Sequence, residues 1–253
     1  MIAWREKFRA FYLHFFITLA MSIAAATLVF LIWYPDPFQV MLGGTKFFLL
    51  VTVCDLVLGP LTSLIIYNSK KTRRALVFDY TVVGIVQLAA FIYGVYSMAS
   101  ARPVYVAFSV DQFEVVMAAE IDDADLKDAK EPYRSRPKWG PVLIGTQGPT
   151  DIEERNNLLF SSLSGKDRQH IPRYYVPYEA NRDEVQRHAS TLEELERVKP
   201  AAKPLVAAAV AKLGTTRDRL RWLPIKSAKS AFWTALVDAD TGRPVYYLPL
   251  EPF

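Results

Sequence analysis

The sequence predicts a membrane protein in which a bundle of three transmembrane helices is followed by a soluble α+β domain with a mainly antiparallel sheet. Three apolar stretches occupy the first hundred residues, at about 11–34, 47–67 and 76–99, and each is long enough to cross a bilayer as a helix. The remainder is polar, charged and rich in proline. We therefore expect a membrane domain at residues 1–99 and a soluble domain at residues 100–253.

The distribution of charge predicts how the chain crosses the membrane. Residues 1–99 contain eight basic and four acidic residues, whereas residues 100–253 contain 22 of each. Basic residues precede the first stretch and fill the loop between the second and third: Arg5, Lys7, Arg9, Lys70, Lys71, Arg73 and Arg74. The positive-inside rule places both segments in the cytoplasm, and three crossings then deliver the soluble domain to the opposite side. Because the excess of basic residues lies at the ends of the apolar stretches, where it orients the chain in the membrane, it does not indicate nucleic-acid binding.

These features predict a multi-pass membrane protein, in contact with the lipid bilayer, with a cytoplasmic N-terminus and a C-terminal domain on the opposite side, which in a bacterium is the periplasm. The first stretch is about twice as long as the core of a signal peptide and ends at Trp33 and Tyr34, which are typical of a membrane boundary. We expect it to remain as an anchor. The single cysteine, Cys54, lies in the second stretch, so the soluble domain is expected to fold without an internal disulfide.

Polar residues inside the apolar stretches are the first candidates for a functional role. Asp55 lies near the middle of the second stretch, where a carboxylate normally needs a partner. Counting from the cytoplasmic side places Gln87 and Ser22 at a similar depth. Asp55 either bonds to Gln87 and fixes the bundle, or receives a polar group from another membrane helix. Gly59 and Pro60 predict a bend in the second helix, because proline removes a backbone donor.

The sequence pattern of the soluble part predicts strands, then helices, then strands. Strands are expected near 102–109, 113–119, 221–225, 232–238 and 244–248, with irregular connections at 132–149 and 171–178. Capping-box spacing predicts helices that begin at Thr150 and Thr191. A further helix over 205–213 ends at Gly214. This order predicts an α+β domain with a largely antiparallel sheet.

Catalytic and metal-binding patterns are weak in this sequence. It has no P-loop, no GxSxG and no dinucleotide fingerprint, and its histidines lack the spacing of a zinc site. An enzyme would need Asp111, Glu114, His170 and His188 to converge in one cleft. We therefore predict no catalytic residue, no metal and no cofactor, and expect a protein that is not an enzyme.

Several ordered segments carry a resemblance to a known family. They are Phe11-Tyr-Leu-His14, Trp33-Tyr-Pro-Asp-Pro37, Asp55-Leu-Val-Leu-Gly-Pro-Leu-Thr62, Gln87-Leu-Ala-Ala-Phe-Ile-Tyr-Gly94, Ala101-Arg-Pro-Val-Tyr105 and Asp111-Gln-Phe-Glu-Val-Val116. Together they resemble the TfpX/TfpZ-type (FimB-like) type IV pilin accessory proteins over residues 1–120. The motif residues after the third stretch are Arg102, Pro103, Tyr105, Asp111, Phe113 and Glu114.

The resemblance implies an inner-membrane protein that helps a particular major type IV pilin to assemble into the pilus, with no cofactor. Our first hypothesis is two-part binding, in which the pilin's membrane helix packs on the bundle and its periplasmic head contacts the domain. The alternative is a membrane-anchored regulator of pilus extension and retraction, acting on inner-membrane pilus assembly proteins; an apolar pocket in the domain would favour it. A third is an enzyme that modifies pilin.

Overall fold

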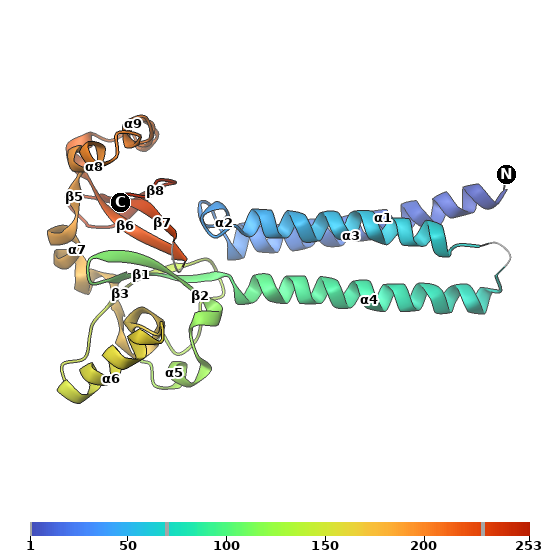
Figure 1. Cartoon of the computed structure of the whole chain (residues 1–253), viewed down its shortest axis with the longest axis horizontal. Coiled ribbons are helices and arrows are strands. Elements are labelled where there is room, and N and C mark those ends of the chain that lie inside the picture. Colours follow the sequence, from blue (N-terminus) through green and yellow to red (C-terminus); the bar gives the residue numbers. More distant parts are fainter. Residues whose placement is uncertain (1, 69–70, 229–230) are drawn as a thin grey trace. The chain divides into compact units, whose positions relative to one another are not determined.

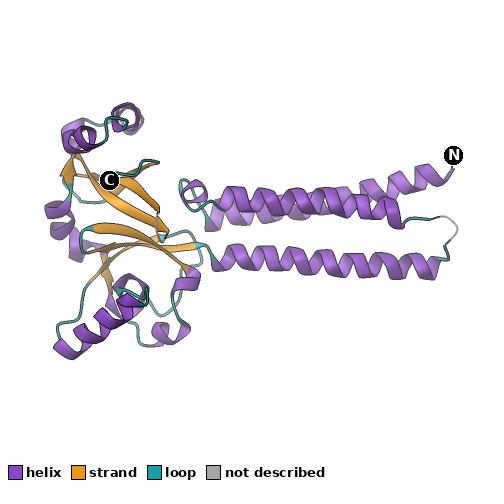
Figure 2. Cartoon of the chain, viewed as in Figure 1, coloured by secondary structure: helices purple, strands orange, loops and turns teal. Residues whose placement is uncertain are grey.

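A computed structural model describes residues 2–68, 71–228 and 231–253, and Lys70 of the predicted cytoplasmic loop lies outside these residues. The described chain divides into two compact units, Met1–Ala101 and Arg102–Phe253. Figure 2 shows that one unit is built from helices and that the other combines helices with a sheet.

The first unit contains three long apolar helices. They are α1 (Ile2–Thr27, continued by a π-helical segment Leu28–Trp33), α3 (Gly44–Ile66) and α4 (Arg73–Ser100), and the short helix α2 (Phe38–Met41) lies between the first two. The segments Trp4–Trp33, Gly44–Ile66 and Arg73–Ser100 are long and apolar enough to cross a membrane. The side chain of Thr72 accepts from the backbone N–H of Ala75 and caps α4.

The central helix of this unit is α3. It packs against α1 along most of its length and against α4, whereas α1 and α4 make few contacts with each other. At one end of the unit, Tyr34 is buried and its hydroxyl donates to the carbonyl of Met98 at 3.0 Å. Val29 packs with these two residues in a small apolar cluster. The helices are therefore tied together at that end, while α1 and α4 stay apart elsewhere.

The second unit is built on one mixed sheet. Its strands are β1 (Pro103–Ser109), β2 (Gln112–Met117), β3 (Val142–Thr146), β4 (Tyr175–Pro177), β5 (Ser190–Thr191), β6 (Leu220–Ala228), β7 (Ala231–Asp238) and β8 (Pro244–Leu248). The order across the sheet is β4-β3-β1-β2-β6-β7-β8, and β5 pairs with β6. Pairings β1–β3 and β2–β6 are parallel, and the others are antiparallel. The predicted mainly antiparallel sheet is roughly correct.

The helices of this unit are α5 (Asp123–Lys127), α6 (Ile152–Leu163), α7 (Arg182–His188), α8 (Leu192–Val198) and α9 (Ala202–Leu213). The predicted capping box of Thr191 is confirmed, and Gly214 ends α9 in the left-handed region with φ of 61°. The predicted capping box at Thr150 is wrong by one residue. Asp151 caps α6 instead, and its carboxylate accepts from the backbone N–H of Glu154 at 2.9 Å.

Two strands lie in segments that we expected to be irregular. The strands β3 and β4 fall within 132–149 and 171–178. Strand β3 extends the sheet by parallel pairing with β1, and β4 then adds to β3. Such short strands depend on partners that are far away in the sequence, so the local pattern did not predict them.

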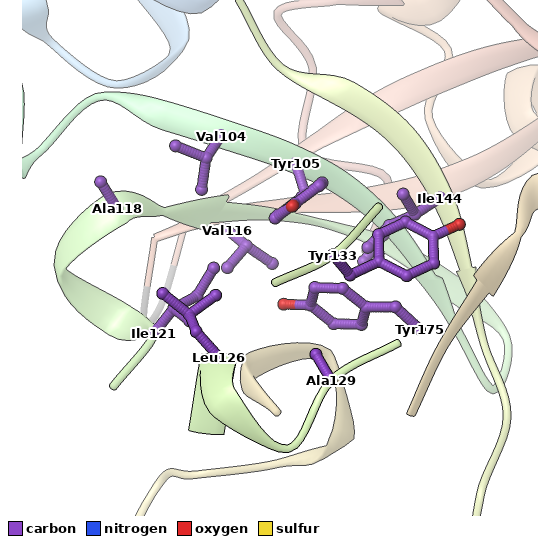
Figure 3. Close-up of a cluster of buried hydrophobic side chains, with 11 residues drawn as sticks. Val104, Tyr105, Val116, Ala118, Ile121, Leu126, Ala129, Tyr133, Ile144 and Tyr175 are labelled. Carbon is purple, nitrogen blue, oxygen red and sulfur yellow. The ribbon is translucent and has the colours of Figure 1, made fainter. Parts of the chain in front are cut away.

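The buried apolar residues described in this unit include two clusters. One is centred on Tyr105, Tyr133 and Tyr175, whose rings pack edge to face with centroids 5.0–6.5 Å apart (Figure 3). The other packs α8 and α9 against β6, β7 and β8, with Leu195 and Val206 fully buried. The sheet therefore carries buried apolar residues along most of its width.

Candidate intramembrane polar groove

A groove between α1 and α4, with α3 at its base, collects polar side chains in the apolar unit. Its cavity has a volume of about 160 Å³ and is lined by His14, Ile17, Thr18, Met21, Asp55, Gly84, Gln87, Leu88 and Phe91. We call these nine residues the polar groove. It exists because α1 and α4 both pack on α3 and make few contacts with each other.

Asp55 lies where the polar groove meets a second cavity. This smaller space, of about 20 Å³, is lined by Asp55 and by Ser22, which is only 5% exposed. Within the described residues, the Asp55 carboxylate has no hydrogen bond and no ion pair. The structure thus brings Asp55, Gln87 and Ser22 to the walls of two adjoining cavities.

The hydrogen bond that we considered between Asp55 and Gln87 is not formed. The Gln87 amide lies over Gly59 instead, one helical turn after Asp55, where an added β-carbon would be 2.4 Å from its Nε2. Glycine leaves space on the surface of α3, and the long Gln87 side chain fills that space. Counting residues predicted the depth of Gln87 along the helices but not which residue of α3 its amide would contact.

His14 is a groove residue that our reading of the sequence missed. Its Nδ1 lies 2.6 Å from the Oγ of Ser63, which is fully buried, so this contact joins α1 to α3. Its Nε2 would lie 3.2 Å from a β-carbon at Gly59. A histidine inside an apolar stretch is the same kind of signal as Asp55, and it could have identified this residue.

The predicted bend at Gly59 and Pro60 concerns the same part of α3. Both residues are buried, and α3 remains one continuous helix from Gly44 to Ile66 with Pro60 inside it. The bend stays a prediction. Close packing of α1 and α4 side chains around Gly59 is the feature that the structure adds.

The motif residues that follow the third helix lie mostly in the core of the second unit. Pro103, Tyr105, Phe113 and Glu114 are buried, whereas Asp111 is exposed at the turn between β1 and β2. Burial raises the pKa of Tyr105 to about 12. A partly buried Arg102 donates to the carbonyl of Pro137 at 3.2 Å. Most of these residues therefore build the fold, and they do not form a common surface.

Of the four residues that an enzyme would need in one cleft, only Glu114 and His170 meet in the described part of the chain. The His170 Nε2 lies 3.5 Å from a Glu114 oxygen, while Asp111 and His188 are exposed elsewhere. Gln169 and Lys226 donate to the same carboxylate at 2.9 and 3.2 Å. The four-residue cleft that an enzyme would need is not formed.

The electrostatics of Glu114 are those of a buried, well-paired carboxylate. Burial raises its pKa, but the hydrogen bond from His170 and the charge of Lys226 outweigh burial, so the pKa lies below its ordinary value. Gln169 also accepts from Ser109 at 3.1 Å, and this extends the network toward β1. We interpret this cluster as a structural link between β1, β2, β6 and the segment around His170.

Comparison with known proteins identifies the family. A model described as "Fimbrial assembly protein FimB" matches residues 2–43. Fimbrial assembly proteins of Dichelobacter nodosus are similar over most of the chain. Those of serogroups I and E1 are 30% and 29% identical over 242 residues, covering 90% of this chain and 89% of each relative.

A shorter relative from the same organism, the fimbrial assembly protein of serogroups C1 and C2, is 36% identical over 109 residues, which is 43% of this chain and 83% of that protein. No solved structure matches the chain. The family resemblance drawn from the sequence is thereby confirmed. With 30% identity to the serogroup I protein over nine-tenths of its length, the chain belongs to the FimB family of fimbrial assembly proteins.

Proposed function

We propose that this protein holds its cognate major type IV pilin in the inner membrane and promotes assembly of that pilin into the pilus. The names of its relatives support a role in fimbrial assembly. The observation that carries the proposal is the Asp55 carboxylate, which has no partner among the described residues and lies in a groove between helices that are long enough to cross a membrane. The groove would receive the pilin's membrane helix.

The polar groove suits a helix that carries a hydrogen-bond donor within its apolar stretch. A carboxylate inside a bilayer is costly, and a donor from an incoming helix would lower that cost. Gly84 lines the groove, and a β-carbon there would meet no atom within 4 Å, so an approaching helix has room. Small residues at such a surface allow two helix backbones to come close.

The proposed membrane topology is deduced from the positions of the basic residues. Arg5, Lys7, Arg9, Lys71 and Arg73 lie at the end of the unit that we assign to the cytoplasm. The second unit would then be periplasmic and could contact the pilin head, with inner-membrane pilus assembly proteins as further partners. A transient holder must release its client, so this second contact is expected to be modest in area.

The alternative function, a regulator of pilus extension and retraction, has less support. An apolar sensing pocket in the second unit would favour it. Two cavities described there, of about 300 and 310 Å³, are lined largely by polar and charged residues, including Lys130, Glu154, Arg168 and Arg173. We therefore retain subunit holding as the proposed function.

Photocrosslinking in membranes tests the proposal. Probes replace Ile17 and Leu88 in the polar groove, and a control probe replaces Ile65, which is 80% exposed and lies outside the groove residues. A probe at Trp139, which is 72% exposed, reports on contacts of the second unit. The motif residue Tyr105 is buried, so a probe there could not reach a partner. The cognate pilin is co-expressed.

Adducts of pilin mass at Ile17 and Leu88, and not at Ile65, are the expected result. Adducts only with assembly-platform proteins would contradict the proposal and favour the regulator. The same conclusion would follow if no adduct formed while deletion of the protein still abolished pili.

A further inference from the structure

Helix α6 carries an apolar face that points away from its own domain. Ile152, Leu159, Phe160 and Leu163 are 61–85% exposed, and no residue of α6 is buried. Their spacing places them on one side of the helix, together with Asn156. We call these five residues the α6 stripe. An amphipathic helix normally turns such a face toward the core.

The opposite face of α6 holds the helix to the domain through polar contacts. The carboxylate of Glu154 accepts from the Tyr174 hydroxyl at 2.9 Å and lies 3.4 Å from Nε of Arg173. Ser161 and Ser162 are half-buried and bond back to the carbonyl of Leu158. The serine bonds lie within the helix, so it is the contacts of Glu154 with Tyr174 and Arg173 that tie this face of α6 to the domain and leave the apolar face outward.

We propose that the α6 stripe is a dimerisation surface, on which α6 of a second copy of this chain packs antiparallel. A twofold interface joins the same surface on both chains, so the surface must be compatible with itself. The stripe satisfies this condition because it contains no charged residue. Glu153 and Arg155 flank it and are exposed, so they would lie at the rim of the contact.

The arrangement of the stripe suits an antiparallel pair. Reversing one copy about the middle of α6 places Ile152 opposite Leu163 of the partner chain at both ends. Leu159 then faces Asn156 of the partner chain, and Phe160 lies beside them. In this register, large apolar side chains occupy both ends of the contact, Leu159 and Asn156 of each chain share its centre, and no charge is buried.

The area of the stripe matches the lower limit of a specific interface. Its four large apolar side chains present an area on the order of 500 Å², which is as large as the largest apolar patches of monomeric proteins. If both copies buried this area completely, the contact would total about 1,000 Å², which is the threshold for a biological interface and lies in the range of weak ones. Chains confined to one bilayer by their apolar helices meet at a raised effective concentration, so an interface of this size suffices.

Cysteine crosslinking of the full chain in membranes tests the proposal and its register. Every variant carries Cys54→Ala, because Cys54 is an exposed free cysteine. Chains with Ile152→Cys and chains with Leu163→Cys are co-expressed and treated with a short bis-maleimide. The antiparallel register predicts a dimer-sized adduct from the mixture and much less from either variant alone.

A charged residue placed in the α6 stripe should disrupt the proposed dimer contact. Phe160→Glu in both co-expressed chains should lower the crosslinked fraction at least about tenfold, because a buried aromatic contact is replaced by an unpaired charge. Val198→Glu is the matched control: Val198 is 59% exposed on α8 and lies outside the stripe, so its crosslinked fraction should not change. Both positions are exposed, and both variants should therefore fold.

Three results would overturn the proposal. One is the absence of a dimer-sized adduct from the mixture while the chains remain folded in the membrane. Another is an adduct that forms equally well from Leu163→Cys alone, which indicates a different register. The third is an adduct of another mass, such as that of pilin, which means that a different protein occupies the stripe.

Discussion

The terminal amide of Gln87 lies so close to Gly59 that a β-carbon at position 59 would be 2.4 Å from its Nε2. Nε2 of His14 would lie 3.2 Å from the same carbon. Side chains from α1 and α4 therefore meet over a residue of α3 that has no side chain. This arrangement closes one side of the cavity in which the Asp55 carboxylate has no partner among the described residues.

The first prediction concerns Gly59→Ala. Alanine favours a helix by about 1 kcal/mol over glycine, and the Gln87 amide that its β-carbon would meet is the far end of a flexible side chain, which moves aside at little cost. We expect the free energy of unfolding in detergent to rise by up to about 1 kcal/mol. Adding Gln87→Ala should change it little, and a fall in both variants would show that the His14 ring, and not Gln87, resists the added carbon. Gly84→Ala is the control, because a β-carbon there meets no atom within 4 Å and should not destabilise the protein.

The second prediction concerns Asp55→Asn. No described hydrogen bond depends on this carboxylate, so protein level and thermal stability should stay unchanged. Pilus assembly should fall roughly tenfold, the effect of losing one charge-assisted hydrogen bond of about 1.5 kcal/mol. Immunoblots of the protein and counts of surface pili measure both quantities. A reduced protein level would show instead that Asp55 stabilises its own bundle.

The third prediction tests the link between α1 and α3. Ser63→Ala removes the partner that lies 2.6 Å from Nδ1 of His14, and should lower the free energy of unfolding by about 1 kcal/mol. Thr62→Ala is the matched control, because the Thr62 hydroxyl bonds only within its own helix, to the carbonyl of Leu58. Equal losses in the two variants would contradict a special role for the His14 contact.

The fourth prediction is a pH dependence of the second unit. The pKa of Glu114 in the folded protein lies below its ordinary value of 4.5, since His170 and Lys226 stabilise the charged form against the effect of burial. Its contribution to stability is therefore present above pH 4.5 and is lost as the pH falls from 4.5 through the lower pKa of the folded state. Urea unfolding of the full chain, followed by tryptophan fluorescence, measures this loss.

Glu114→Gln tests whether this residue causes the acid sensitivity. The variant should be less stable at neutral pH by about 1–3 kcal/mol, because Lys226 and His170 lose a charged partner, and its stability should change less below pH 4.5. Glu193→Gln is the control, since Glu193 is exposed on α8 and lies 3.8 Å from Arg217. If both variants keep the acid sensitivity, another group is responsible.

Local signals predicted much of the secondary structure. The capping box of Thr191, the left-handed Gly214 and the bounds of β8 were read from residue type and spacing, because caps and turns depend on atoms a few residues apart. Strand β3 was missed because its stability comes from parallel pairing with β1, which lies almost forty residues earlier. Residue types alone do not report such distant pairing.

The candidate site, like the secondary structure, could be predicted from the sequence only in part. The sequence by itself indicated that three apolar stretches carry Asp55, Gln87 and Ser22 at comparable depths, since the rise per residue of a helix is constant. Only the tertiary structure decided which of these side chains meet. Helix rotation and the missing side chain at Gly59 bring Gln87 and His14 together and leave Asp55 facing a cavity, because packing between helices, and not spacing along them, selects lateral partners.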